Sequence, residues 1–175
     1  MQVMTKSSTT GDKSSRIDSK RKITVYATVL SLTLLWCVLF MSVPFLAEGN
    51  PLARKLAAVI SLFFSFVCHQ AAERSFHLMG HPFAVCIRCS SIYVGFLLGV
   101  ILYPFIRNWN DRSLPPRKIL WIGMLPTALE MGVFRLLLNV PDPFFRSLSG
   151  LILGAVVSLY TIPGLFSAFH IHQSA

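Results

Sequence analysis

The chain has 175 residues, of which 54% are hydrophobic and only 13% charged, and its mean hydropathy is +0.62. A soluble domain of this length would need far more charge on its surface. Long apolar runs instead indicate an integral membrane protein of one domain. The formal net charge of +9 does not indicate nucleic-acid binding, because no recognition motif accompanies it.

Residues 1–22 form the most basic segment. They contain six Lys and Arg residues and few large apolar ones, so we expect a disordered basic tail. Basic residues beside a first membrane span usually determine its orientation, which predicts a cytoplasmic N-terminus. Residues 23–175 would then form a single membrane domain.

Five apolar runs follow the tail. At ~1.5 Å per residue, a helix needs about 20 apolar residues to cross a core of ~30 Å. The first run is long enough, and it is also longer than the core of a signal peptide, so we expect an uncleaved span. The second has 12 residues, in the range of a re-entrant or interfacial helix. The runs are Ile23–Leu46, Leu56–Val67, Ile92–Ile106, Ile119–Leu138 and about Leu148–Phe169.

The predicted fold class is an all-α polytopic membrane protein with four transmembrane helices plus a short re-entrant or fifth helix. With four spans both termini are cytoplasmic, and ten basic residues lie inside against five outside. With five spans the counts are nine inside and six outside, and residues 68–90 face the cytoplasm. The positive-inside rule favours four spans, by a small margin.

Small residues recur every fourth position at Ser91, Gly95 and Gly99, and again at Gly150 and Gly154. This spacing lets helix backbones approach closely in lipid. It predicts contact between helices of the same chain, with a homo-oligomer face as the alternative.

Between the second and third runs the chain gathers three of its four cysteines and three of its five histidines. Cys86 and Cys89 form a C-x-x-C pair, and Cys68 lies 18 positions upstream with His69 directly after it. Three thiolates and one imidazole suit tetrahedral zinc, so we predict a Cys₃His site.

Other interpretations of these side chains are open. His77 and His81 are alternative fourth ligands. The C-x-x-C pair also fits a membrane thiol–disulfide oxidoreductase. The cysteines would otherwise be a buried apolar cluster, since buried cysteine usually behaves as a small hydrophobe.

Polar residues around the thiols suit a zinc environment. Gln70 or Glu73 would orient the imidazole through its free N–H. Arg74 and Arg88 would offset the negative charge of a three-thiolate centre.

The residues from Cys68 onward resemble an uncharacterised family of small prokaryotic membrane proteins known as domain of unknown function 2085. The resemblance covers roughly residues 62–164 and implies a prokaryotic inner (plasma) membrane protein, but no activity. It gives weight to Cys68, His69, Cys86 and Cys89 as one set. One departure is Glu130, where the family pattern leads us to expect aspartate before glycine. The matching segments are "CHQ", "RSF", "CIRC", "IYVG" and, downstream, Arg146, Ser149 and Gly150.

The run 119–138 carries Glu130, which we place ~13–18 Å from either end of the helix. An ionisable group at that depth is costly and suggests a function, which would be a proton or ion relay, a transporter, or a carboxylate serving the thiol site. The alternative is a buried ion pair. Arg135 lies about 140° around the helix from Glu130, so the two do not share a face, and Arg146 is another possible partner. No hydrolase, kinase or nucleotide signature is present, so the sequence assigns neither a reaction nor a substrate.

Overall fold

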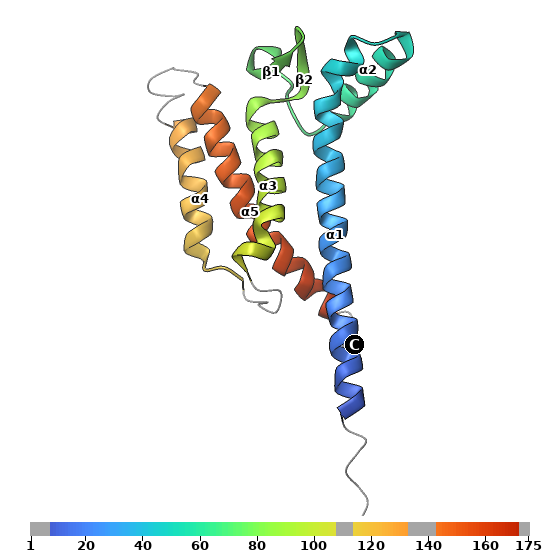
Figure 1. Cartoon of the computed structure of the whole chain (residues 1–175). Helices are drawn as coiled ribbons and strands as arrows, with labels where there is room; N and C mark the ends of the chain where they lie inside the picture. Colours follow the sequence, from blue (N-terminus) through green and yellow to red (C-terminus); the bar gives the residue numbers. More distant parts are fainter. Residues whose placement is uncertain (1–7, 108–113, 133–142, 172–175) are drawn as a thin grey trace, which may run out of the picture.

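The computed structural model describes residues 8–107, 114–132 and 143–171 (Figure 1). The chain is mostly helical, as predicted, but a short β-hairpin corrects the all-α class. The elements in chain order are α1 (Ser8–Ala47), α2 (Pro51–Ser65), the 3₁₀ turn η1 (Ala72–Arg74), β1 (Ser75–Leu78), β2 (His81–Cys86), α3 (Ile87–Ile106), α4 (Arg117–Leu129) and α5 (Pro143–Ile171).

Three described helices are long and apolar enough to cross a membrane. They cover Ser19–Ala47 of α1, Ile87–Ile106, which is all of α3, and Pro143–Ala168 of α5. The prediction of four spans plus a fifth helix is not confirmed. The fourth predicted span, residues 119–138, is described only as far as Gly132, where a π-helical turn follows α4.

The long helices run side by side (Figure 1). α3 packs against α5 over most of its length, α4 packs on the outer side of α5, and α1 packs on α3 and on the hairpin. The N-terminal end of α1 and the C-terminal end of α5 lie at the same end of the bundle, and the hairpin lies at the other (Figure 1). We call the end with the hairpin the cysteine end and the other the terminal end.

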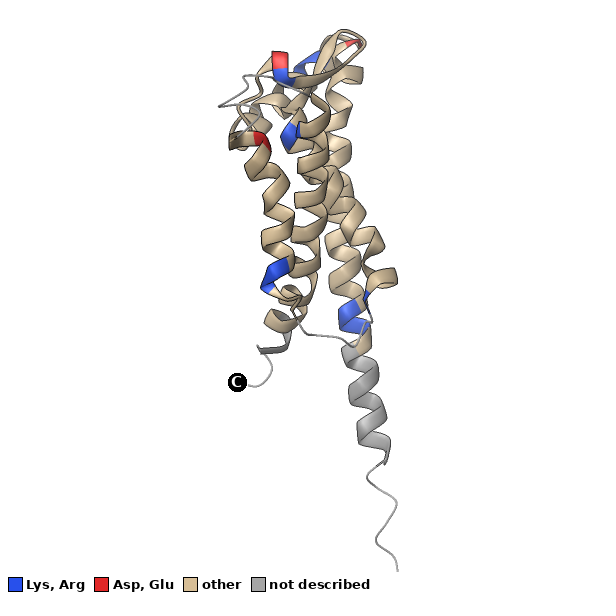
Figure 2. Cartoon of the chain, turned by 90° about the vertical axis from the view of Figure 1, so that its left-hand side faces the viewer, with Lys and Arg blue, Asp and Glu red and all other residues tan. Residues whose placement is uncertain are grey.

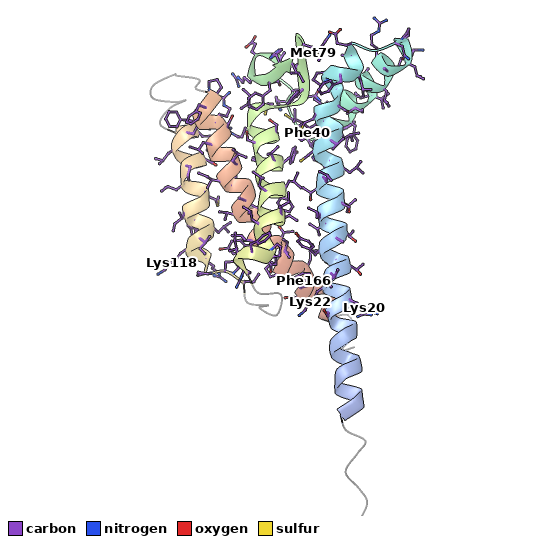
Figure 3. All side chains as sticks on the ribbon, viewed as in Figure 1. Lys20, Lys22, Phe40, Met79, Lys118 and Phe166 are labelled. Atoms are coloured by element: carbon purple, nitrogen blue, oxygen red, sulfur yellow. The ribbon has the colours of Figure 1, made fainter. Side chains whose placement is uncertain are left out.

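Charged side chains gather towards these two ends. Figure 2 shows Lys, Arg, Asp and Glu near the ends of the helices and an uncharged stretch between them. Lys20, Lys22 and Lys118 lie at the terminal end, and Met79 marks the tip of the hairpin at the cysteine end (Figure 3). The uncharged middle is the part of the bundle that lipid tolerates best.

The short helix α2 does not run the length of the bundle. It begins with Pro51 in its first turn, after Asn50, whose side-chain Oδ1 accepts a hydrogen bond from the Ala53 N–H at 2.9 Å. Its 15 residues give a length of about 22 Å, too short for the membrane core. α2 packs against α1 and β2 at the cysteine end (Figure 1). This position agrees with the predicted re-entrant or interfacial helix.

The small residues lie in the contact between α3 and α5. A Cβ added at Gly95 or Gly154 would overlap the backbone of the facing helix, at Leu151 and Ile92 respectively. A Cβ added at Gly150 would meet the Ser91 side chain and the Arg88 carbonyl of α3. The predicted same-chain contact is therefore confirmed for these residues, and the same face is not free to bind a second copy.

The hairpin was not predicted. β1 and β2 pair antiparallel, with Ser75 opposite Cys86 and Leu78 opposite His81. Met79 and Gly80 form the two-residue turn, and both have positive φ, of 53° and 79°. Positive φ at both positions is typical of a type I′ hairpin turn, for which a glycine at the second position is the usual sequence signal.

The helix α1 begins at Ser8, so helix continues into residues 8–22, where the sequence predicts a disordered tail. No proline interrupts the chain before Pro44, which lets the helix extend beyond the apolar run. Residues 1–7 lie outside the described part of the chain.

Candidate metal centre

Cys68 is positioned by the end of α2. Its N–H donates to the Phe64 carbonyl at 2.9 Å, which continues the last turn beyond Ser65, and the residue is 7% exposed. The side chain of Gln70 then holds the following loop. Gln70 has a positive φ of 46°, and its Nε2 donates to the carbonyls of Ser61 at 2.5 Å and Ala84 at 2.7 Å. These bonds join α2 to β2 behind Cys68.

Cys86 and Cys89 are positioned by the start of α3. Cys86 ends β2 and is also the N-terminal cap of α3, with extended φ and ψ of −68° and 162°, and Cys89 lies in the first turn. The hairpin returns the chain to Cys68, where the Cys86 N–H donates to the Cys68 sulfur at 3.2 Å. A strand end and a helix end therefore bring together thiols that are 18 residues apart.

The sulfur atoms of Cys68, Cys86 and Cys89 all lie within 4.8 Å of one another. All three are free thiols. Around a metal with bonds of ~2.3 Å, tetrahedral geometry sets neighbouring sulfurs about 3.8 Å apart. The three thiols are thus close to metal-binding geometry and need only a small further approach.

His69 is not part of this group. It follows Cys68 in a non-helical segment, and neighbouring residues of such a segment point in different directions, so the imidazole is exposed. The predicted Cys₃His set is therefore corrected to a Cys₃ group. The alternative imidazoles have other contacts: His77 Nδ1 lies 3.0 Å from the Ser75 carbonyl, and His81 Nε2 lies 3.2 Å from Glu48 Oε1.

The local environment favours a thiolate at Cys86. Its pKa is lowered to about 5, chiefly because the Cys89 thiol donates a hydrogen bond to the sulfur. Backbone N–H groups of Cys89 and Arg88 and the Cys68 thiol lower the pKa further, and burial opposes them. Such donors gather at a helix N-terminus, which is a common place for reactive or metal-binding cysteine.

The inner side of the thiol group is aromatic, a feature that sequence reasoning missed. Phe64 is fully buried in the same core cluster as Cys68, and Trp36 and Tyr93 pack on it. The Trp36 ring lies 5.0 Å from that of Phe64 and 5.8 Å from that of Tyr93, edge to face in both cases. An apolar wall of this kind limits the access of water to a metal site.

The other side of the thiol group opens into a pocket of ≈ 300 Å³. Besides the three cysteines, its lining includes His69 and three arginines, Arg74, Arg88 and Arg146. Glu73 is exposed on η1 and is not among the lining residues. The pocket therefore combines thiols with a strong positive charge.

Two of these arginines pair with Glu130. The Glu130 side chain is buried, and one of its oxygens forms an ion pair with Arg88 Nη2. The other oxygen lies 3.5 Å from Arg146 Nε. Arg146 was predicted from the sequence as a possible partner, whereas Arg88 was expected to serve the thiols alone. Arg135 lies outside the described residues.

Glu130 follows the last residue of α4, where a π-helical turn runs on to Gly132. Its partners Arg88 and Arg146 lie in the first turns of α3 and α5, which start at the cysteine end. The carboxylate is therefore level with the thiol group along the bundle.

Fold and site together define a helical membrane protein with a three-thiol group at one end, beside a buried cluster of one carboxylate and two arginines. Residues 68–160 match the family described as predicted membrane protein, domain of unknown function 2085, and the chain belongs to this family. The match begins at Cys68 and includes every member of the thiol group and the ion-pair cluster.

Two archaeal relatives are both uncharacterized proteins. The uncharacterized protein MJ1492 of Methanocaldococcus jannaschii is 34% identical over 128 residues, which cover 72% of this chain and 81% of that protein. An uncharacterized protein of Methanothermobacter thermautotrophicus is 40% identical over 48 residues, covering 27% of this chain and 42% of that protein. No solved structure matches the chain.

Proposed function

We propose that this protein binds one zinc ion through Cys68, Cys86 and Cys89 at the cysteine end of a membrane-embedded helical bundle. The observation that carries the proposal is the approach of three free thiols to within 4.8 Å from two separate segments. Thiolate sulfur is the soft ligand that zinc prefers, and a C-x-x-C pair with a distant third cysteine is a usual ligand pattern.

Charge supports the assignment. Three thiolates around Zn²⁺ leave one net negative charge, and the arginines that line the adjacent pocket provide the compensating positive charge. An ionised group in a partly dry environment needs such compensation.

Metal analysis of the purified protein tests the proposal. We expect about one zinc per chain, lost on replacement of Cys68, Cys86 or Cys89 by serine, since each variant would keep only two of the three protein ligands. Cys37→Ala is the matched control, because Cys37 is 3% exposed in α1 and lies outside the thiol group. Substoichiometric zinc that is equal in all four variants would overturn the assignment.

We also propose that the segment that contains α4 is a fourth span and that the N-terminus is cytoplasmic, in a prokaryotic plasma membrane. Four spans bring both termini to one side, in agreement with their common position at the terminal end. The ten basic residues assigned to that side in the four-span count exceed the five at the cysteine end. We assign the lipid bilayer as the partner of these helices. A homo-oligomer would require a face other than the α3–α5 contact.

Reporter fusions test this topology. A reporter that works only in the cytoplasm should be active when fused after Ala175. A reporter that works only outside the membrane should be active when inserted at Gly80, at the hairpin tip. A C-terminal reporter active outside would instead support five spans and place the thiols in the cytoplasm.

A second candidate function is thiol–disulfide exchange by Cys86 and Cys89. The lowered pKa of Cys86, about 5, favours it, because the thiolate is the attacking form. In this case the Cys86 thiolate attacks a disulfide of a partner protein and releases one of its sulfurs as a thiolate, and Cys89→Ser should accumulate the resulting mixed disulfide, detectable as a dithiothreitol-sensitive band. A zinc site predicts loss of metal from the same variant and no such band.

For Glu130 we propose a structural role, as the anion that holds Arg88 and Arg146 together. A proton or ion relay is the alternative. The two arginine contacts support the structural role, because removing the carboxylate would leave both guanidinium groups without their anion.

A further inference from the structure

The positive charge next to the thiols exceeds what the described groups balance. Three guanidinium groups, of Arg74, Arg88 and Arg146, line the pocket, and the carboxylate that contacts two of them is Glu130. A zinc ion with three thiolates would add one negative charge. One positive charge is then left over at the pocket, enough for one small anion.

Arg146 presents hydrogen-bond donors to the pocket. The residue is only 7% exposed, and its one contact within the described residues is the 3.5 Å approach of Nε to Glu130. The described part of the chain offers its two terminal nitrogens no hydrogen-bond acceptor. The two terminal nitrogens are not among the buried described atoms that lack a partner, so they are accessible from the pocket that Arg146 lines, where their N–H donors can bind an acceptor.

Glu130 cannot supply that acceptor alone, because it is also engaged by Arg88. One carboxylate oxygen pairs with Arg88 Nη2, and the other meets Arg146 at Nε. Arg146 is thus anchored through Nε while its planar fork is left for another group. A guanidinium fork is well matched to the paired oxygens of a phosphate or carboxylate.

Two helix N-termini add to the positive electrostatic potential at the pocket. α3 starts at Ile87 and α5 at Pro143, and both starts lie at the cysteine end (Figure 1). The N-terminal ends of helices carry partial positive charge and favour anions within the first turn. Arg88, Cys89 and Arg146 all belong to these first turns.

We propose that the pocket binds a phosphate-type oxyanion that occupies the fourth zinc position and is held by Arg146, with the exposed Arg74 at the mouth. The inference rests on the proposed zinc site, in which three protein ligands leave one tetrahedral position open. His69 does not fill that position, because it is exposed and outside the thiol group. A volume of ≈ 300 Å³ is at the small end for ligand pockets, so the anion is a free phosphate or the phosphate of a lipid headgroup rather than a large metabolite.

Cobalt substitution provides the test. Full-length protein in detergent is loaded with Co²⁺, cobalt content is measured, and inorganic phosphate is titrated at constant ionic strength while the thiolate–cobalt absorption bands are followed. We expect a saturable spectral change. Its midpoint should rise at least tenfold in Arg146→Lys, which keeps the charge but loses the fork, and severalfold in the surface variant Arg74→Gln. Lys118→Gln, at the opposite end (Figure 3), should match the wild type.

The outcomes separate the two proposals. Failure of the wild-type protein to bind cobalt would overturn the zinc site and this inference with it. Bound cobalt whose spectrum ignores phosphate, or a midpoint unchanged in both arginine variants, would overturn the anion site while the zinc site stands. In phosphate-free nanodiscs, a spectral change with phosphatidylglycerol that is absent with an uncharged glycolipid would identify the lipid headgroup as the source. A response to inorganic phosphate alone would identify the free anion.

Discussion

The cysteine end and the α3–α5 contact hold the same helices together in opposite ways. At the cysteine end α3, α4 and α5 meet through one buried carboxylate and two arginines, Glu130, Arg88 and Arg146. Along the rest of their length, α3 and α5 touch backbone to backbone through residues such as Gly95 and Gly154. Lipid offers no hydrophobic driving force between helices, so association depends on polar bonds and close packing. In this chain the polar bonds and the close packing occur at different levels along the helices.

The level at which each kind of helix contact occurs has a physical reason. Charged groups are least costly near the ends of a span and most costly at its centre. Close packing by glycine has no such cost and can be used anywhere. The ion-pair cluster accordingly lies level with the first turns of α3 and α5, and the glycine contact runs below it.

The largest expected effect is at the ion-pair cluster. Glu130→Gln should destabilise the fold by ~3–5 kcal/mol, because two buried guanidinium groups lose their anion. Reversible unfolding in mixed detergent micelles measures the change. Zinc per folded molecule should be unchanged.

The matched control is Glu48→Gln, which removes an exposed carboxylate paired with His81 at 3.2 Å. An exposed pair of this kind contributes ~0–1 kcal/mol. If Glu130→Gln were as stable as Glu48→Gln, the structural role of Glu130 would be wrong and the relay interpretation would gain support.

A smaller effect is expected at the glycine contact. Gly154→Ala adds a methyl group that overlaps the backbone of Ile92, so α3 and α5 must separate, at ~1–3 kcal/mol. The same unfolding measurement applies. Gly164→Ala is the control, since its new methyl meets no atom within 4 Å, and we expect it to be neutral or stabilising by ~0.5–1 kcal/mol. Equal stability of the two variants would show that the helices do not pack as closely as described.

The smallest effect concerns protons released on zinc binding. Cys86, with a pKa of about 5, is already a thiolate at pH 7 and releases no proton to zinc there. The number released per zinc should therefore be below the three thiols of the group, and affinity should fall as the pH approaches 5 and Cys86 is protonated. Calorimetry in buffers of different ionisation enthalpy gives the count. Release of three protons at pH 7 would contradict the lowered pKa.

Much of the candidate site could be predicted because its ligands are cysteines with recognisable spacing. Cys68, Cys86 and Cys89 were identified from the C-x-x-C pair and its neighbours, and the structure brings their sulfurs together. Whether His69 joins the thiol group could not be predicted in this way. It is adjacent to Cys68 in the sequence, but neighbouring side chains in a non-helical segment point in different directions. Gln70 was expected to orient an imidazole, but it bonds two carbonyls and so holds α2 to β2.

The sequence by itself determined that this is a helical membrane protein, because a backbone in lipid must satisfy its own hydrogen bonds and only long apolar helices do so along a single run. It also determined which thiols can meet. The tertiary structure alone decided that α2 turns back at the cysteine end, that the hairpin returns Cys86 to Cys68, and that Glu130 pairs with Arg88 as well as Arg146. These contacts join residues 16 to 42 positions apart, whose side-chain directions depend on how the helices pack and are not encoded in any local pattern.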